Sequence, residues 1–404
     1  MLKYWETTQT VAESNKMRIA LVGLTHPFRG GISHYTTLLC HALMERHHVR
    51  FFAFNRQYPN LLFPGKTQKD ASPPIIRVPN DPCLDSINPL SWLLTLKKII
   101  SFRPDFILFS WWHPFFAPAF GTMAYLSWWL ARIPSCYLCH NIYPHERTRP
   151  DRILLRYAFG SAQGFITHSQ RGCEQIQRRY PHRPVYKAHH PDYGAFAGGA
   201  QIPMSRARER LGLSGKRILL FFGVVRKYKG LNYLLKAMQW LPPSDGYHLV
   251  VAGEFYEDIG TYRSELKRLL DKGQLTLVDR YVPNAEVGCY FSAADLVVLP
   301  YLSINQSGVL QMAYGFLKPV IATTVGGIPE VVTDGSTGYL VPPGDSQAIA
   351  MAVERFFVHP DRDLFQKNIQ RHTAVNTWDD MVRSVEKMGK TLTRHAQRAA
   401  SEIQ

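Results

Sequence analysis

Short apolar runs recur along the chain, and each run is followed by a polar or glycine-containing turn and then by an amphipathic segment. Runs of four to six apolar residues are typical of strands that are buried on both faces of a parallel sheet. Apolar residues three or four apart in the following segments are typical of helices. The repeated alternation of strand and helix predicts an α/β fold with doubly wound parallel sheets.

Two such series are expected, separated by a Gly/Ala-rich stretch at residues 193–200. Residues 1–16 are predicted to be an N-terminal extension, and residues 17–200 a first Rossmann-like domain with a long proline-containing excursion at residues 55–90. Residues 201–375 are predicted to form a second Rossmann-like domain. Residues 376–404 are predicted to form a helix that packs back toward the first domain and ends in a basic tail. The expected strands are 17–22, 49–54, 106–111, 135–139, 164–168, 185–189, 218–222, 248–252, 276–279, 296–299, 319–322 and 339–341.

The formal charge of +16 is unevenly distributed. Residues 1–212 hold 26 Lys and Arg against 12 Asp and Glu, whereas residues 213–404 hold 21 against 19. A basic first half suits an anionic partner such as an acidic lipid surface or a phosphorylated acceptor. Charge alone would also suit nucleic acid. We find no nucleic-acid-binding motif, so we expect no nucleic-acid partner.

Residues 106–131 contain no Lys, Arg, Asp or Glu, and this length could span a membrane. Pro114, Pro118 and Gly121 interrupt the run, which favours a strand, a loop and a largely buried helix from about Pro118. A patch that dips into a membrane interface, or a site for an apolar acceptor tail, remains an alternative because pairs of Trp flank the segment.

Six cysteines are scattered through apolar stretches of the sequence, and residues 1–16 do not resemble a secretory signal. We therefore expect reduced thiols in a cytoplasmic protein. The run Cys136–His140 matches the attachment motif of c-type haem, but that chemistry requires export, so neither haem nor a metal is expected.

The most informative stretch is ILLFFGVVRKYKGL, residues 218–231. Gly223 ends a buried strand, Arg226 and Lys229 follow three residues apart, and a helix is predicted from near Leu231. A helix N-terminus beside an Arg and a Lys suits an anion with several oxygens. A loop with solvated charges remains the alternative from this segment alone.

Two further segments of the first half are candidates for a ligand site. Gly30 and Gly31 precede an amphipathic helix and would let the backbone approach a ligand. The third glycine of a dinucleotide fingerprint is missing, so NAD is not expected. His140, Asn141, His145 and Glu146 follow a predicted strand, where open α/β sheets bind ligands. Structural histidines remain the alternative.

The second half resembles retaining glycosyltransferases of family 4, the glycosyl transferases group 1 superfamily. The matching text is FFGVVRKYKGL, VVAGEFYED, YFSAADLVVLPY and NQSGVLQMAYGFLKPVIATTVGGIPEVVTDGSTGYLVPPGD. The first half agrees more loosely through RIALVGLTHPFRGGISHYT and CHNIYPHE, so the resemblance covers about residues 17–390. It implies the GT-B fold, in which two Rossmann-like domains face a cleft.

The resemblance also implies roles for individual residues. Arg226 and Lys229 would hold the donor diphosphate, and His140 would lie beside the donor sugar. The residues expected on the donor side are Gly30, Gly31, Gly223, Gly253, Glu254, Ser307, Gly308, Val309 and Glu330. The residues expected on the acceptor side are His26, Arg29, Trp112, His113, Asn141, His145 and Glu146.

One feature departs from the family pattern. The family often has two Glu eight residues apart before Pro319, whereas this chain has no acidic residue between Asp295 and Glu330. Asn305, Gln306 and Gln311 stand there instead, and a branch of the family shares this QSGV wording. The departure puts in doubt how the ribose and sugar hydroxyls are held.

The expected function is transfer of a sugar, with retention and without a metal ion, from a UDP- or GDP-sugar to a glycan or lipid-linked acceptor. The nucleotide sugar is a substrate, so no cofactor is expected. The resemblance implies polysaccharide or glycolipid synthesis at the cytoplasmic face of a membrane. The basic excess of the first half, beside the Trp-flanked segment Trp111–Trp129, predicts peripheral contact with anionic lipid. An inactive protein that binds a sugar nucleotide or a glycan is the main alternative. Another GT-B enzyme, such as an epimerase or phosphorylase, is a second alternative.

Overall fold

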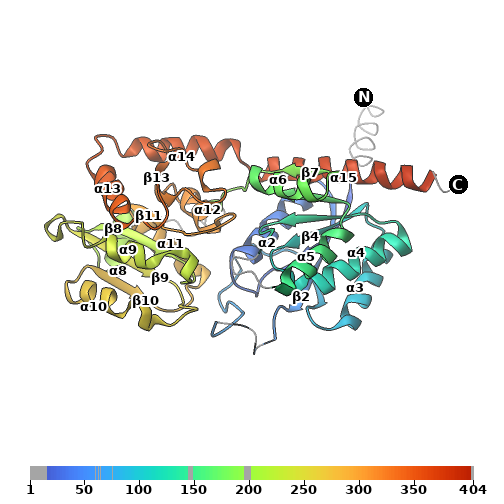
Figure 1. Cartoon of the computed structure of the whole chain (residues 1–404), viewed down its shortest axis with the longest axis horizontal. Helices are drawn as coiled ribbons and strands as arrows, with labels where there is room; N and C mark the ends of the chain where they lie inside the picture. Colours follow the sequence, from blue (N-terminus) through green and yellow to red (C-terminus); the bar gives the residue numbers. More distant parts are fainter. Residues whose placement is uncertain are drawn as a thin grey trace, which may run out of the picture. The chain divides into compact units, whose positions relative to one another are not determined.

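The computed structural model describes residues 16–59, 61, 63, 65–74, 76–143, 149–194 and 202–401. The described chain forms two compact units (Figure 1). Unit 1 comprises the described parts of residues 1–62, 76–189 and 378–404, and unit 2 comprises those of residues 63–75 and 190–377. The chain therefore passes between the units at four points of the sequence.

The core of unit 1 is a parallel sheet. Within the described residues it has seven strands in the order β3-β2-β1-β4-β5-β6-β7. The first six follow the strand order of a doubly wound Rossmann fold. The strands are β1 (Arg18–Gly23), β2 (His48–Arg56), β3 (Asp81–Asp85), β4 (Phe106–Trp111), β5 (Ser135–Cys139), β6 (Gly164–Thr167) and β7 (Val185–Lys187).

Helices cover both faces of this sheet (Figure 1). Helix α4 contacts both α3 and α5 on one face, whereas α2 contacts α15, the last helix of the chain. The right-handed crossovers of parallel strands require this division, because the connections reverse direction at β1. The helices are α2 (Gly31–Met44), α3 (Pro89–Phe102), η2 (Pro114–Phe116), α4 (Ala117–Ala131), α5 (Arg149–Ser161), α6 (Gln170–Arg179) and α15 (Trp378–Ser401).

Unit 2 has the same doubly wound sheet topology as unit 1. Its described strands form a six-stranded parallel sheet in the order β10-β9-β8-β11-β12-β13. These strands are β8 (Arg217–Phe222), β9 (Tyr247–Ala252), β10 (Leu275–Val278), β11 (Leu296–Leu299), β12 (Val320–Thr323) and β13 (Gly338–Val341). The helices are α8 (Met204–Leu211), η3 (Lys227–Lys229), α9 (Leu231–Ala237), η4 (Pro243–Asp245), η5 (Ile259–Tyr262), α10 (Arg263–Asp271), α11 (Asn284–Ala293), α12 (Gly308–Gly315), η6 (Ile328–Glu330), α13 (Ser346–Phe357) and α14 (Asp363–Val375).

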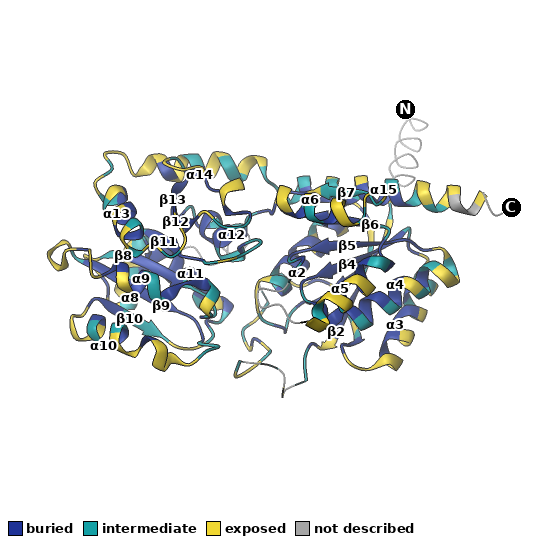
Figure 2. Cartoon of the chain, in the orientation of Figure 1, coloured by how far each residue is buried: buried dark blue, intermediate teal, exposed yellow. Residues whose placement is uncertain are grey.

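The expected fold class is confirmed, since both units are doubly wound parallel sheets whose central strands are buried (Figure 2). Strands β4, β5 and β11 have the bounds that the apolar runs predicted. The excursion at residues 55–90 holds two features that the sequence did not reveal. Its end forms β3, and its middle, residues 63–75, belongs to unit 2.

The long apolar segment 106–131 forms β4, η2 and α4. Trp111 and Trp112 are buried, whereas Trp129 near the end of α4 is 73% exposed. Within the part of the chain that the structure describes, no helix has both the length and the apolar character needed to cross a bilayer.

Helix α15 returns the end of the chain to unit 1. Met388 and Leu392 pack so closely on Gly164 of β6 that an added Cβ there would lie 2.6 Å from the Met388 sulfur. The Glu386 carboxylate lies 3.1 Å from His47 Nε2, and Thr391 lies 2.9 Å from the Tyr186 hydroxyl. Packing and polar contacts together make α15 an integral layer of unit 1.

We expect Met388→Ala to destabilise unit 1 by about 3 kcal/mol, because a fully buried side chain is replaced by a cavity that the surrounding helix and strand can fill only in part. The measurement is urea unfolding followed by tryptophan fluorescence. Arg394→Ala on the exposed side of the same helix is the matched control and should shift the midpoint little. Equal midpoints for the two variants would contradict the role given to α15.

Candidate active site

The carboxyl ends of β8 and β9 in unit 2 approach each other through two glycines. An added Cβ on Gly253 would lie 2.1 Å from the Gly223 carbonyl oxygen, so only glycine fits there. Gly223 has a left-handed backbone with φ of 87°, and its N–H donates to Ala252 O. This turn lies beside the point where the strand order reverses, between β8 and β11, which is where doubly wound sheets bind ligands.

Lys229 occupies the space that the Gly223 turn leaves. Its Nζ lies 3.1 Å from the position that a Gly223 Cβ would take, and 6.0 Å from the centre of the Tyr301 ring. The residue is 6% exposed. Burial, with a smaller contribution from the positive charge of Arg226, lowers the pKa of Lys229 to about 8.

Arg226 precedes the short η3 helix, and its guanidinium lies over the Tyr256 ring at 5.2 Å from the ring centre. Among the described residues, neither Arg226 nor Lys229 has a carboxylate within ion-pair distance. A buried cation without a counter-charge lowers stability and is typical of a site that receives an anion.

The N-terminus of α12 adds further positive potential to the same region. Ser307 caps the helix by accepting a hydrogen bond from Leu310 N, and its Oγ lies 3.2 Å from the Tyr301 hydroxyl. Val309 Cγ2 lies 3.6 Å from the position of a Gly223 Cβ, so the first turn of α12 adjoins the glycine turn. Backbone N–H groups at a helix start are suited to phosphate oxygens.

Glu330 lies on a turn that packs against the loop before α12. Gly326, with φ of 57°, approaches so closely that an added Cβ would lie 1.6 Å from Ile304 O. Gly327 N donates to Asn305 O at 3.0 Å. Glu330 itself is exposed at the end of η6. The structure thus brings the loops that carry Asn305 and Glu330 together.

Glu254 is buried next to Gly253 and is held by the 63–75 segment. Its carboxylate accepts the Lys66 backbone N–H at 2.6 Å, while its main-chain oxygen accepts Val225 N–H at 2.9 Å. The Phe63 and Tyr256 ring centres are 6.0 Å apart, and the Arg226 guanidinium lies over the Tyr256 ring. Sequence reasoning placed Glu254 near the donor but did not find this partner.

Asp70 anchors the 63–75 segment on unit 2. One carboxylate oxygen accepts the backbone N–H and hydroxyl of Ser72, and the other accepts the Tyr281 hydroxyl at 2.8 Å. Burial alone would raise the pKa of Asp70, but the hydrogen bonds from Ser72, Tyr281 and the Asn284 backbone together lower it. The acid is therefore charged at neutral pH.

In unit 1, His140 ends a directed chain of hydrogen bonds. Thr36 Oγ1 donates to the Ile32 carbonyl, so it accepts from Ser110 Oγ at 3.0 Å. Ser110 Oγ in turn accepts from His140 Nε2 at 3.0 Å. This order places a proton on Nε2 of His140. Thr36 and Ser110 come from α2 and β4, on either side of Gly23, where an added Cβ would lie 2.9 Å from Ser110 Cβ.

Aromatic rings enclose His140 within unit 1. Tyr35 meets the His140 ring edge-on at 4.6 Å, and it also contacts His168 at 5.2 Å and Trp378 at 5.1 Å. Burial lowers the pKa of His168 to about 4, and its Nδ1 donates to Ala188 O, so the ring is neutral at pH 7. Sequence reasoning missed Tyr35 and Ser110. For Tyr35 the available signal was the hydroxyl-rich helix start after Gly31.

The remaining candidates of unit 1 divide into three groups. Gly30 precedes α2 with φ of 103°, and nothing lies within 4 Å of a Cβ added there or at Gly31, so this helix start is open within the described residues. His26, Arg29 and Asn141 are partly exposed in the adjoining loops. Trp112 and His113 have local structural contacts, since the Trp112 ring centre lies 4.2 Å from that of Phe116 and His113 Nδ1 accepts the Phe115 N–H at 3.1 Å. His145 and Glu146 lie outside the described residues.

No group of three His, Cys, Asp or Glu side chains suited to a metal ion occurs among the described residues.

Comparison with known proteins matches both halves of the chain. Residues 29–189 match the model of Glycosyltransferase Family 4, and residues 216–358 match that of Glycosyl transferases group 1. An alpha-D-kanosaminyltransferase from Streptomyces kanamyceticus is 26% identical over 51% of this chain and 54% of its own. A D-inositol 3-phosphate glycosyltransferase from Mycobacterium bovis is 30% identical over 43% of this chain and 37% of its own. The chain thus spans about half the length of the curated relatives it matches, or less.

Among solved structures, Anabaena HepE in complex with UDP has a TM-score of 0.68 and 18% identity, covering 96% of this chain and 100% of HepE. At this identity the likeness concerns the fold, and it agrees with the two parallel sheets described above. With both halves matched in order, the chain belongs to the GT-B glycosyltransferases of family 4, the glycosyl transferases group 1 superfamily.

Proposed function

We propose that this protein transfers a sugar from a nucleotide-sugar donor, UDP- or GDP-linked, to a glycan or lipid-linked acceptor with retention of configuration. The observation that carries the proposal is the pair Arg226 and Lys229, which lies beside the Gly223 turn without a carboxylate partner among the described residues. UDP is the nucleotide bound to the related structure of HepE, which supports a nucleotide-sugar donor here as well.

The chemistry follows from what these groups offer. The bond between the sugar carbon and the diphosphate oxygen breaks, and negative charge grows on the departing diphosphate. Arg226 and Lys229 would stabilise that charge, and the α12 N-terminus would add backbone donors. The acceptor hydroxyl oxygen forms the new bond to the same sugar carbon, and its proton passes to the departing diphosphate oxygen. In unit 1 the family resemblance assigns His140 a place at the reaction centre.

The acceptor side of the proposal rests on charge. The basic excess of the first half suits a lipid-linked acceptor at the cytoplasmic face of an anionic membrane, with the protein bound peripherally. Polysaccharide or glycolipid synthesis would supply such an acceptor.

The first test is a screen of UDP-, GDP- and ADP-sugars for protection against thermal unfolding. The donor found is then incubated with candidate acceptors, and products are detected by mass spectrometry. Donor turnover that depends on an added acceptor supports the transferase. Binding of a donor without turnover for any acceptor would favour the alternative, an inactive protein that binds a sugar nucleotide.

We expect Arg226→Ala and Lys229→Ala each to lower kcat/KM by ~10²-fold or more, equivalent to roughly 3 kcal/mol of transition-state stabilisation. Lys227→Ala is the matched control, because Lys227 is an exposed cation of the same η3 turn. The control should keep nearly normal kinetics. Normal kinetics in both of the first two variants would exclude this turn as the diphosphate site.

Donor binding should weaken as pH rises through about 8. A bound diphosphate stabilises the protonated form of Lys229, whose pKa in the free protein is lowered to about 8 by burial. Above that pH a proton has to be taken up on binding, so Kd should rise by about tenfold between pH 7 and pH 9. Calorimetry with an intact nucleotide sugar measures this slope. Lys229→Arg should flatten it, and a slope unchanged in that variant would assign the titration to another group.

Activity should survive EDTA, because the side-chain cations and the α12 N-terminus supply a positive field at the departing diphosphate. The assay compares initial rates with EDTA, and with EDTA followed by excess Mg²⁺ or Mn²⁺. A loss of activity that either metal restores would show that a divalent ion takes part.

A further inference from the structure

Large apolar residues are exposed on α3, α4 and α5, at positions where helices on an open sheet usually present polar residues. On α5 they alternate with the exposed Arg149, Arg152 and Arg156, and Figure 2 shows which parts of these helices are exposed. On α3 the exposed positions recur at intervals of three and four residues as three leucines followed by Lys97. On α4 they include Tyr125 and Trp129, one turn apart, and on α5 they include Ile153 and Tyr157, again one turn apart. The exposed apolar residues of these helices are Leu90, Leu93, Leu94, Tyr125, Trp129, Leu130, Ile153 and Tyr157.

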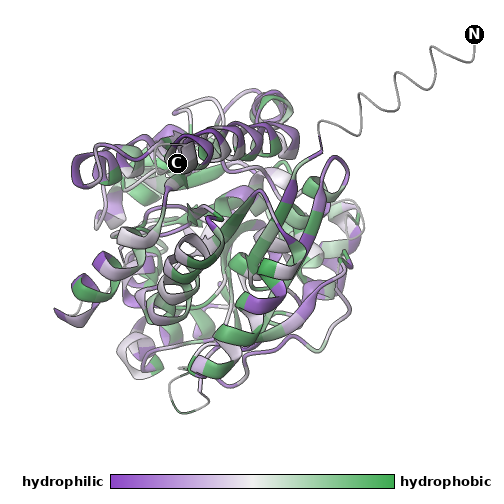
Figure 3. Cartoon of the chain, turned by 90° about the vertical axis from the view of Figure 1, so that its right-hand side faces the viewer, coloured by the Kyte–Doolittle hydropathy of each residue, from purple (hydrophilic) through white to green (hydrophobic). Residues whose placement is uncertain are grey.

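Because α4 contacts both α3 and α5, these side chains lie on one face of unit 1, which we call the outer apolar face. Figure 3 shows the chain from the right-hand side of Figure 1, coloured by the hydropathy of each residue. An exposed apolar surface of this kind marks an interaction site.

The same helices, with the neighbouring α6, are strongly basic. They carry eight Lys and Arg against two acids, Asp151 and Glu174. The basic residues are Lys97, Lys98, Arg149, Arg152, Arg156, Arg171, Arg178 and Arg179. Lys98 is paired with Asp81, and Arg178 lies 3.9 Å from Glu174. Apolar side chains and cations on the same helices are complementary to a bilayer surface that contains anionic lipid.

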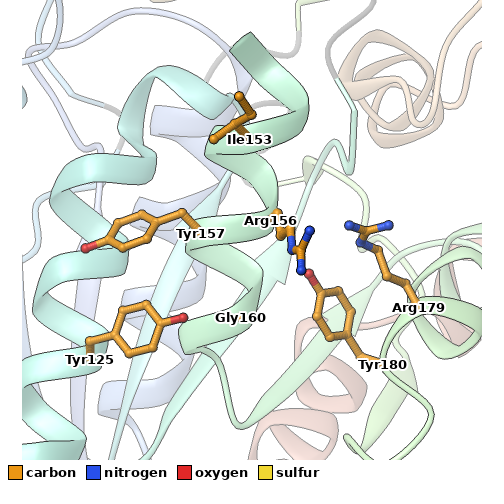
Figure 4. Close-up of a pocket in the computed structure, with 7 residues that line it drawn as sticks. All are labelled: Tyr125, Ile153, Arg156, Tyr157, Gly160, Arg179 and Tyr180. Atoms are coloured by element: carbon orange, nitrogen blue, oxygen red, sulfur yellow. The ribbon is translucent and has the colours of Figure 1, made fainter. Parts of the chain in front are cut away.

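A hollow of about 700 Å³ opens between α4, α5 and α6 (Figure 4). Helix α5 lines it with Ile153, Arg156, Tyr157 and Gly160, which have the spacing of one helical face. Tyr125 lines it from α4, and Arg179 and Tyr180 line it from the end of α6.

The wall between α4 and α5 is built by two tyrosines that each cover a glycine of the other helix. A Cβ added to Gly121 would lie 2.5 Å from the Tyr157 ring, and one added to Gly160 would lie 2.9 Å from the Tyr125 hydroxyl. The two rings are 5.4 Å apart, and Thr122 lies 2.9 Å from the Tyr157 hydroxyl. The hollow is therefore defined by close packing.

Three polar groups of the hollow have unused hydrogen-bonding capacity. The Tyr180 hydroxyl is buried and has no hydrogen-bond partner among the described residues. Its ring is fixed against Phe165 at 5.7 Å. Arg156 and Arg179 have no carboxylate within ion-pair distance in the part of the chain that the structure describes. Two guanidinium groups and a phenol suit a phosphate group.

We propose that the outer apolar face docks on an anionic membrane surface and that the hollow receives the phosphate of an anionic phospholipid headgroup. Trp129, Leu130 and the leucines of α3 would reach the acyl boundary, while Arg156, Arg179 and the Tyr180 hydroxyl would lie at the level of the headgroups. This inference gives a location to the membrane contact proposed above and rests on it. It does not depend on sugar transfer.

The test is co-sedimentation of the full chain with vesicles of phosphatidylcholine, with and without phosphatidylglycerol, over a series of salt concentrations. No nucleotide sugar is present, so the docking can fail while transferase activity stands, and the reverse. We expect binding only to the anionic vesicles, and binding that weakens with salt but persists because of the apolar contacts. Absence of binding at low salt would overturn the proposal.

Two double variants distinguish lipid binding by the hollow from attraction caused by the overall positive charge. Arg156→Gln with Arg179→Gln should weaken binding by about twenty-five-fold, since each cation near an anionic surface is worth about fivefold in affinity. Arg206→Gln with Arg210→Gln removes the same charge from exposed positions of α8 in unit 2 and should change binding little. Equal losses in the two double variants would overturn the assignment to this face.

Tyr180→Phe tests the hollow without changing charge. If the hydroxyl meets a headgroup phosphate, the variant should bind anionic vesicles several-fold more weakly. Its melting temperature should stay the same or rise, because a buried hydroxyl without a partner is removed. Unchanged vesicle binding would overturn the headgroup role of the hollow.

Leu93→Ser with Trp129→Ser should remove the part of the binding that resists salt. Sedimentation velocity of the wild type without lipid completes the test. A stable dimer that these two substitutions dissociate, together with no vesicle binding, would assign the outer apolar face to a second copy of the chain and overturn the membrane proposal.

Discussion

Burial of one ammonium group, that of Lys229, is the constraint on which the functional part of unit 2 depends. Lys229 is 6% exposed and has no carboxylate within ion-pair distance among the described residues. Its position requires the left-handed turn at Gly223, whose missing side chain leaves room for Nζ. It also requires Gly230, where an added Cβ would lie 1.9 Å from Pro300 O. The fold thus accepts an electrostatic cost that a bound diphosphate would relieve.

Much of the fold was predictable because the strands of a doubly wound sheet are buried on both faces. Runs such as Phe106–Trp111 and Leu296–Leu299 therefore appear in the sequence as plain apolar segments with sharp ends. Strand β3 was missed because it lies at the sheet edge and contains Pro82 and two acids, so it has no such run. The cations and glycines of the anion site were predictable because their residue types are unusual at a strand end.

The contacts that orient the site could not be predicted, because they join residues far apart in the sequence. The 63–75 segment has no regular period, yet its Lys66 backbone binds Glu254 and its Asp70 binds Tyr281. The hydroxyl chain from Thr36 through Ser110 to His140 likewise joins three elements. Such polar contacts depend on the final packing of loops and strands, and a single sequence gives no measure of that packing.

Helix α4 shows how one apolar segment can serve two surfaces. Its inner side, including Phe120 and Met123, is fully buried against the sheet, whereas Trp129 and Leu130 point outward. Composition alone could not separate these roles, since the whole segment lacks charged residues. An outer face made only to be solvated would carry polar residues, as α15 does at Arg383, Lys387 and Lys390. The outer faces of α15 and α4 therefore differ in polarity, as docking of the outer apolar face on a membrane surface, proposed above, would require.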